Sequence, residues 1–139
     1  MREQFGDADD WVIALGTNDA RVHPPGQYTG LIRRMLERIG RGHRVVWVNV
    51  HTPGQPEQMT AWNDALAMVA AERSGEMLVY DWAAVAAQHP EWMTEDRIHY
   101  TAEGYRARAF AVAFGARALF EAAGPARVAP RSAPAVAVS

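Results

Sequence analysis

The sequence has no cysteine, no lysine and only three serines. Without cysteine, the chain can form no disulfide, no thiolate metal site and no cysteine nucleophile. All 14 basic residues are arginines, and the formal net charge of −2 gives no basic excess of the kind that binds nucleic acid or an anionic membrane. No apolar run reaches the roughly 18 residues of a membrane span, and the polar start does not have the pattern of a signal peptide. The sequence therefore predicts no nucleic-acid partner and leaves the cellular compartment open.

The chain does contain enough apolar material for a core. Of its 139 residues, 49% are hydrophobic, which suffices for one globular domain. After residue 123 the sequence becomes low in complexity, with alanine, proline and arginine dominating. Segments of this kind bury too little apolar surface to fold. We therefore expect one domain over residues 1–123 and a disordered tail over residues 124–139.

Three short apolar runs, separated by segments with helical spacing, predict the fold class. The runs suit parallel strands covered on both faces and lie at residues 11–15, 45–50 and 77–80. Helical periodicity follows each of them, at residues 28–39, 56–73, 82–88 and from Thr101 onward, with a loop at 16–26. This order predicts an α/β fold with a parallel sheet and right-handed crossovers. In the last helix, Tyr105, Phe110, Ala113 and Phe120 are expected to pack inward.

The segment Gly16-Thr17-Asn18-Asp19 directly follows the first predicted strand. Ligands bind beyond the carboxyl ends of the strands in sheets of this class. Gly16 allows a sharp turn there, and the Asn18 amide can then donate to an oxyanion that develops during acyl transfer. The alternative is an Asx-turn, in which Asn18 and Asp19 bond to their own backbone.

An acid three residues before a histidine, Asp96 and His99, lies in a polar loop ahead of the last helix. This spacing lets a carboxylate bind one imidazole nitrogen and leaves the other facing a cleft, as a general base requires. The alternative is a loop carboxylate beside a surface histidine. His51 is a rival base because it also follows a strand, whereas Asp81 is expected to cap a helix.

Other arrangements have less support from the sequence. A metal site built from His23, His89, His99 and Asp96 has no recognisable ligand spacing. A flavodoxin-like nucleotide-binding domain is a further alternative, but no glycine-rich phosphate loop follows any predicted strand. The sequence therefore gives little support to a metal site and none to nucleotide binding.

Taken together, the Gly16–Asp19 segment and the Asp96/His99 pair, followed by Thr101 and Gly104-Tyr105, resemble the SGNH (GDSL-type) hydrolase family. The closest resemblance is to the SGNH domains of acyltransferases that O-acetylate cell-surface glycans, such as peptidoglycan O-acetyltransferase-like proteins. It covers about residues 9 to 120. The resemblance implies a three-layer α/β/α, flavodoxin-like fold. It also implies acyl-ester or acetylated-glycan substrates and no metal or organic cofactor. For a full-length parent, it implies an extracytoplasmic site.

The resemblance also implies site roles, with Asn18 as an oxyanion-hole donor, His99 as the base and Asp96 as the acid that orients it. The family's nucleophile motif, Gly-Asp-Ser at the end of a first strand, has no counterpart here. Gly6-Asp7-Ala8 has alanine at the hydroxyl position and no strand ahead of it. None of the serines, which are Ser74, Ser132 and Ser139, follows a predicted strand.

We therefore expect the chain to represent the C-terminal part of such a domain, without its first two strands and its nucleophile. Little or no esterase activity is expected of the chain alone. Loss of a neighbouring strand leaves an apolar parallel edge, which predicts self-association. The alternative is a non-catalytic relative that binds a glycan or acyl ligand or pairs with a complete copy.

Overall fold

A computed structural model describes residues 9–124 of the chain. Its strands are β1 (Asp10–Ile13), β2 (Arg44–Val48) and β3 (Met77–Tyr80). Its α-helices are α2 (Thr17–Val22), α3 (Tyr28–Ile39), α4 (Pro56–Glu72), α5 (Trp82–Ala86) and α6 (Ala102–Ala123), and two 3-10 turns are η1 (Pro25–Gln27) and η2 (Pro90–Trp92). The predicted tail lies outside the described residues except for Gly124, which follows the end of α6.

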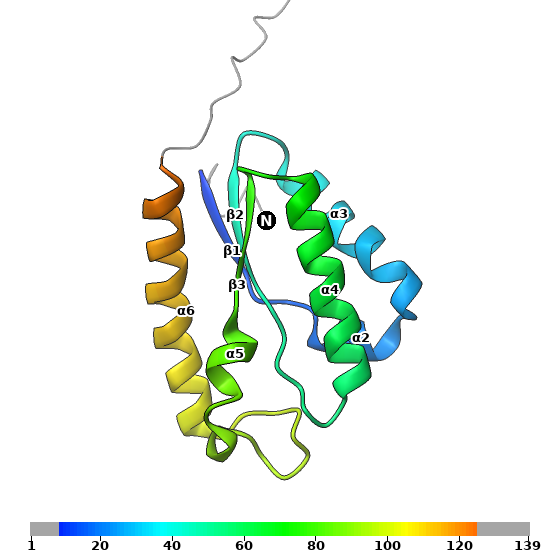
Figure 1. Cartoon of the computed structure of the whole chain (residues 1–139), viewed down its shortest axis with the longest axis vertical. Coiled ribbons are helices and arrows are strands. Elements are labelled where there is room, and N and C mark those ends of the chain that lie inside the picture. Colours follow the sequence, from blue (N-terminus) through cyan, green and yellow to red (C-terminus); the bar gives the residue numbers. More distant parts are fainter. Residues whose placement is uncertain (1–8, 125–139) are drawn as a thin grey trace, which may run out of the picture.

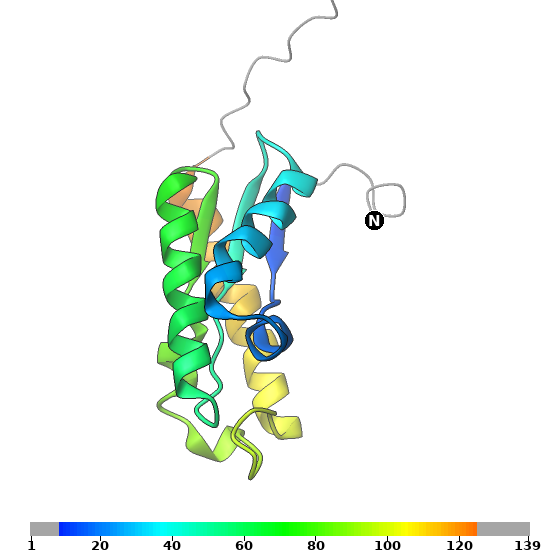
Figure 2. The ribbon, with the colours of Figure 1, turned by 90° about the vertical axis from the view of Figure 1, so that its right-hand side faces the viewer.

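The three strands form one sheet in the order β1-β2-β3, and both pairs are parallel. Figure 1 shows the sheet between α6 on one side and α3 and α4 on the other, and Figure 2 shows α3 and α4 together over the same face. The predicted α/β class, with a parallel sheet between helical layers, is confirmed. All three strands run downward in Figure 1, and the loop between α5 and α6 lies below their carboxyl ends.

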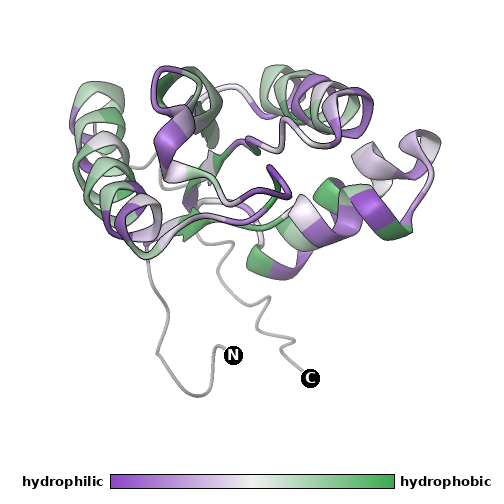
Figure 3. Ribbon diagram, turned by 90° about the horizontal axis from the view of Figure 1, so that it is seen from below, coloured by the Kyte–Doolittle hydropathy of each residue, from purple (hydrophilic) through white to green (hydrophobic). Residues whose placement is uncertain are grey.

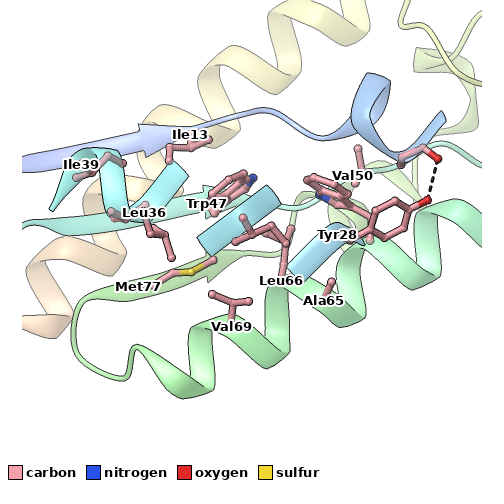
Figure 4. Packing of buried hydrophobic residues seen from close by; sticks show 14 residues of the cluster. Ile13, Tyr28, Leu36, Ile39, Trp47, Val50, Ala65, Leu66, Val69 and Met77 are labelled. Carbon is pink, nitrogen blue, oxygen red and sulfur yellow. Dashed lines mark hydrogen bonds between the residues drawn. The ribbon is translucent and has the colours of Figure 1, made fainter. Parts of the chain in front are cut away.

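The core explains why the central strand is a continuous apolar run. Neighbouring residues of a strand point to opposite faces, and both faces of β2 are covered. Val45 and Trp47 pack into the cluster beneath α3 and α4, which Figure 4 shows from close by. Val48 belongs to a second cluster on the α6 side, together with Trp82. A strand buried on both faces needs apolar residues at consecutive positions.

Two features differ from the sequence-based expectation. Residues 17–22, predicted as loop, form the short helix α2, because the chain turns into helical geometry directly after Gly16. The inward packing expected in α6 is wrong for Tyr105 and Phe110, which are 50% and 65% exposed, and Ala113 is exposed as well. The small residues Gly104 and Ala116 are buried instead. A Cβ at Gly104 would lie 2.4 Å from the carbonyl oxygen of Trp92 in η2, and a Cβ at Gly115 would lie 2.1 Å from the Tyr80 ring in β3. The helix therefore packs closely through its small residues, while the Phe110 ring faces outward.

The outer edge of β1 is open within the described residues. The exposed fractions of Val12 and Leu15 are 48% and 53%, although strands of parallel sheets are normally covered. A hollow of about 620 Å³ lies between β1 and α6, and one of about 710 Å³ lies on the other face, between β1 and α3. In Figure 3, which looks from below, much of α6, at the left, has the colour of hydrophobic residues. The observed sheet is therefore consistent with a partial flavodoxin-like SGNH fold.

Candidate functional site

The loop between η2 and α6 holds Asp96 against His99. His99 Nδ1 lies 2.6 Å from Asp96 Oδ2. The other carboxylate oxygen, Oδ1, accepts hydrogen bonds from the hydroxyl of Thr94 at 2.7 Å and from the backbone N–H groups of Ile98 at 2.9 Å and His99 at 3.0 Å. The loop is closed by the N–H of Thr94, which donates to the carbonyl of His99 at 2.9 Å. Asp96 therefore fixes both the loop backbone and the orientation of the imidazole.

These hydrogen bonds keep Asp96 ionised. The pKa of the Asp96 carboxyl is held far below its ordinary value by four hydrogen bonds. The largest effect comes from the N–H of His99, followed by the His99 ring, the Thr94 hydroxyl and the Ile98 N–H. A carboxylate that accepts several hydrogen bonds is favoured in its charged form. With Asp96 charged, the Nδ1 proton of His99 is directed to it, and Nε2 is left to accept a proton.

Replacing Asp96 by asparagine should reveal this ionisation in the pH dependence of stability. A carboxyl whose pKa is lowered by folding adds stability that is present above its unfolded pKa, about 3.9, and is lost as pH falls through the folded pKa. The wild type should therefore be more stable than Asp96→Asn at neutral pH. The difference should persist down to about pH 4 and shrink only in more acidic solution. Urea unfolding at a series of pH values measures it.

Glu95→Gln is the matched control, because Glu95 is the neighbouring acid and is exposed. Its difference from wild type should stay small at every pH. A loss of the Asp96→Asn difference already between about pH 5 and pH 6 would contradict the lowered pKa.

Asn18 lies in the first turn of α2, directly after β1. Gly16 places it there, with a φ of 135°, and a Cβ at Gly16 would lie 2.3 Å from Nε1 of Trp62. Neither Asn18 nor Asp19 forms the side-chain hydrogen bond to its own backbone that an Asx-turn requires, within residues 9–124. The Asn18 amide is therefore free to donate.

Asn18 and His99 line one hollow of about 170 Å³ at the carboxyl ends of the strands. These two residues are 81 positions apart (99 − 18) in the sequence, and the parallel sheet brings them to the same edge. The hollow also contains His51, the rival base. Burial, with the nearby Arg97 charge, lowers the pKa of His51. No carboxylate of the described residues is bonded to the His51 ring, whereas His99 is paired with Asp96.

The sequence itself matches the family described as GDSL-like lipase/acylhydrolase, over residues 1–107. This match covers more than half of the chain. The chain belongs to the GDSL-like lipase/acylhydrolase family. This confirms the resemblance to SGNH (GDSL-type) hydrolases.

A curated relative shows which proteins of this family the chain is similar to. It is the protein named "Putative peptidoglycan O-acetyltransferase YrhL" from Bacillus subtilis (strain 168). The two sequences are 33% identical over 94 residues, which make up 67% of this chain and 13% of the relative. The chain thus spans a small part of that protein. No solved structure matches the chain.

Other predictions about this GDSL-family site can be compared with the structure. Asp81 caps α5 by accepting from the N–H of Ala84 at 3.1 Å, as expected. His89 pairs with Glu91 at 2.8 Å, apart from the His99 pair. Within residues 9–124, no three His, Cys, Asp or Glu residues gather to hold a metal ion. Among the described helices, none combines the length and hydrophobicity needed to cross a membrane.

Sequence reasoning missed several residues of the hollow. Tyr100 donates its hydroxyl proton to the carbonyl of His51 at 3.0 Å and accepts from Trp82 Nε1 at 2.7 Å, and so it fixes one wall. Tyr105 and Arg108 of α6 form another part of the wall. Tyr105 and Arg108 are three positions apart, a spacing that places two residues on one face of a helix. This spacing could have indicated that they lie together.

Proposed function

We propose that this chain carries the general base, its orienting acid and one oxyanion donor of an enzyme that hydrolyses or transfers acyl groups on esters such as acetylated glycans. The family membership supports the reaction class. The name of the Bacillus subtilis relative supports a glycan substrate. The observation that carries the proposal is the His99–Asp96 hydrogen bond beside a hollow that Asn18 also lines.

The proposed chemistry follows from these positions. As a hydroxyl oxygen attacks the acyl carbon, His99 Nε2 accepts the hydroxyl proton, and Asp96 stabilises the imidazolium that forms. The Asn18 amide donates to the oxygen of the tetrahedral intermediate, where negative charge develops. Collapse of the intermediate breaks the bond to the leaving alcohol, which takes the proton back from His99.

The chain offers no serine for this attack within its described part. Ser74 lies in the turn between α4 and β3, at the opposite end of the strands from the hollow, and Ser132 and Ser139 lie outside the described residues. Thr17 lines the hollow, but its hydroxyl has no hydrogen bond to His99. We therefore expect little or no esterase turnover by the chain alone. The proposed roles can be tested by adding a small alcohol and measuring ester cleavage. The cleavage should depend on both the alcohol and His99.

A second candidate is a binding module without catalysis, which the same lack of a serine in the hollow favours. It predicts that the chain binds an acetylated sugar and releases no acetate. Calorimetric titration with an acetylated sugar, followed by assay of the mixture for free acetate, tests this candidate. Absence of binding heat would contradict it.

We also propose that the open edge of β1 pairs with a second copy of this chain. The two hollows flank β1 on both faces of the sheet, so the element that fills them is a strand, whose side chains alternate between faces. Each copy presents such a strand, and a two-fold axis would align the two β1 edges antiparallel. Phe110 and Phe114, exposed by 65% and 73% in the middle of α6, would then approach their counterparts.

A charge on this edge should reduce self-association. Val12 lines both hollows, and lysine on an edge strand disfavours pairing with another strand. Val12→Lys should therefore sediment as a smaller species than wild type at the same protein concentration. Met68→Lys is the control, because Met68 is also exposed but lies on α4. A wild-type chain that sediments as a monodisperse monomer would contradict the pairing.

A further inference from the structure

Arg108 is a positive charge in the hollow that no acid of the described residues balances. Its side chain lines the hollow beside His99, and its Nε is buried without a hydrogen-bond partner. The guanidinium carbon lies 6.0 Å from the centre of the Tyr100 ring. Because Arg108 lines the hollow and forms no ion pair within residues 9–124, a carboxylate bound in the hollow would meet an unpaired positive charge.

The residues around Arg108 also provide no acid to pair with its charge. Positions three and four residues away on α6 are Gly104, Tyr105, Ala111 and Val112. None of these can form the ion pair that commonly satisfies an arginine on a helix. The residues that line the hollow include no aspartate or glutamate. Together with the donor of Asn18, the hollow is therefore suited to an anionic group.

Tyr105 adds a surface for a sugar ring at the same place. It lies one turn before Arg108 on α6, lines the hollow and is 50% exposed. Its ring packs edge-on against Tyr100 with the centroids 5.5 Å apart, which fixes its orientation. An aromatic ring with an exposed apolar face and a polar tip is suited to packing against a sugar.

We infer that Tyr105 and Arg108 form a subsite for a sugar that bears a carboxylate, next to the ester that His99 and Asn18 act on. The guanidinium binds a carboxylate with two parallel hydrogen bonds, which a neutral sugar cannot accept in this geometry. This inference deepens the proposed function and rests on it, since it names the class of glycan that the site selects.

Titration of the isotopically labelled chain with methyl glucuronide and with methyl glucoside, followed by NMR, tests the subsite. The two sugars differ in the carboxylate. The carboxylated sugar should bind about tenfold more tightly. Arg108→Gln should remove this preference, and Tyr105→Ala should weaken both sugars alike. Arg106→Gln is the matched control, because Arg106 lies two residues away, is exposed and donates to the carbonyl of Ala102.

Three results would overturn the subsite. They are no saturable binding of methyl glucuronide, equal affinity for both sugars, or a preference that survives in folded Arg108→Gln. Circular dichroism establishes whether each variant is folded. His99→Ala should keep the preference, because His99 acts on the ester and Arg108 on the carboxylate. The subsite and the catalytic proposal can therefore fail separately.

Discussion

Replacing His99 by alanine should lower alcohol-dependent ester cleavage by about 100-fold. In this experiment methanol stands in for the attacking hydroxyl, and p-nitrophenyl acetate is the ester. In the proposed mechanism, His99 Nε2 takes the methanol proton, while its Nδ1 stays bonded to Asp96 at 2.6 Å. Release of nitrophenol and formation of methyl acetate, both measured against methanol concentration, give the rate. Without methanol, the wild-type rate should stay close to that of buffer.

The chain offers a matched control for a histidine paired with a carboxylate. His89 Nδ1 lies 2.8 Å from Glu91 Oε1, but neither residue lines the hollow. His89→Ala should leave the methanol-dependent rate unchanged. Asn18→Ala should lower it by about 100-fold, the usual effect of losing an oxyanion donor.

Two outcomes of this experiment would contradict the proposal. If His99→Ala and His89→Ala lower the rate equally, the cleavage is nonspecific imidazole catalysis. If Thr17→Val removes a methanol-independent rate, Thr17 supplies the attacking oxygen, and the chain does not lack a nucleophile.

Gly54→Ala should destabilise the domain by about 1 to 3 kcal/mol. A Cβ at this position would lie 2.5 Å from the carbonyl oxygen of Asp96 and 3.2 Å from that of Arg97. These are backbone atoms, which cannot move aside without displacing the whole loop. The N–H of Gly54 also donates to the carbonyl of Arg97 at 2.9 Å. The substitution should therefore disturb the loop that orients His99.

Thermal unfolding and the methanol-dependent cleavage rate measure the effect of Gly54→Ala. The midpoint should fall by about 3 to 12 °C, and the rate should fall with it. Gly26→Ala is the control, since a Cβ at Gly26 meets no atom within 4 Å. If Gly54→Ala is as stable and as active as Gly26→Ala, close packing of these two loops does not position the site.

Part of the candidate site could be predicted from the sequence, because some of its contacts join residues that are close in the chain. The spacing between Asp96 and His99 is short enough for one loop to join them, and the observed bond lies within that loop. Gly16 predicted a sharp turn after the first strand, and its positive φ confirms that the chain turns there. The packing of α6 could not be predicted in the same way. Its apolar residues surround most of the helix, so the sequence pattern did not decide that Phe110 would face outward.

The sequence by itself determined the fold class and the family, because the order of strands and helices and the short motifs can be recognised without knowing how they meet in space. It also determined the pairing of Asp96 with His99, because the two residues are three positions apart. Only the tertiary structure decided that Asn18 and His99 share one hollow with Arg108. These three side chains come from α2, the loop before α6 and α6 itself. Their meeting depends on the order of the strands in the sheet and on how α6 packs against it. Packing between elements decides which residues meet in this way, and no local pattern of residues predicts that packing.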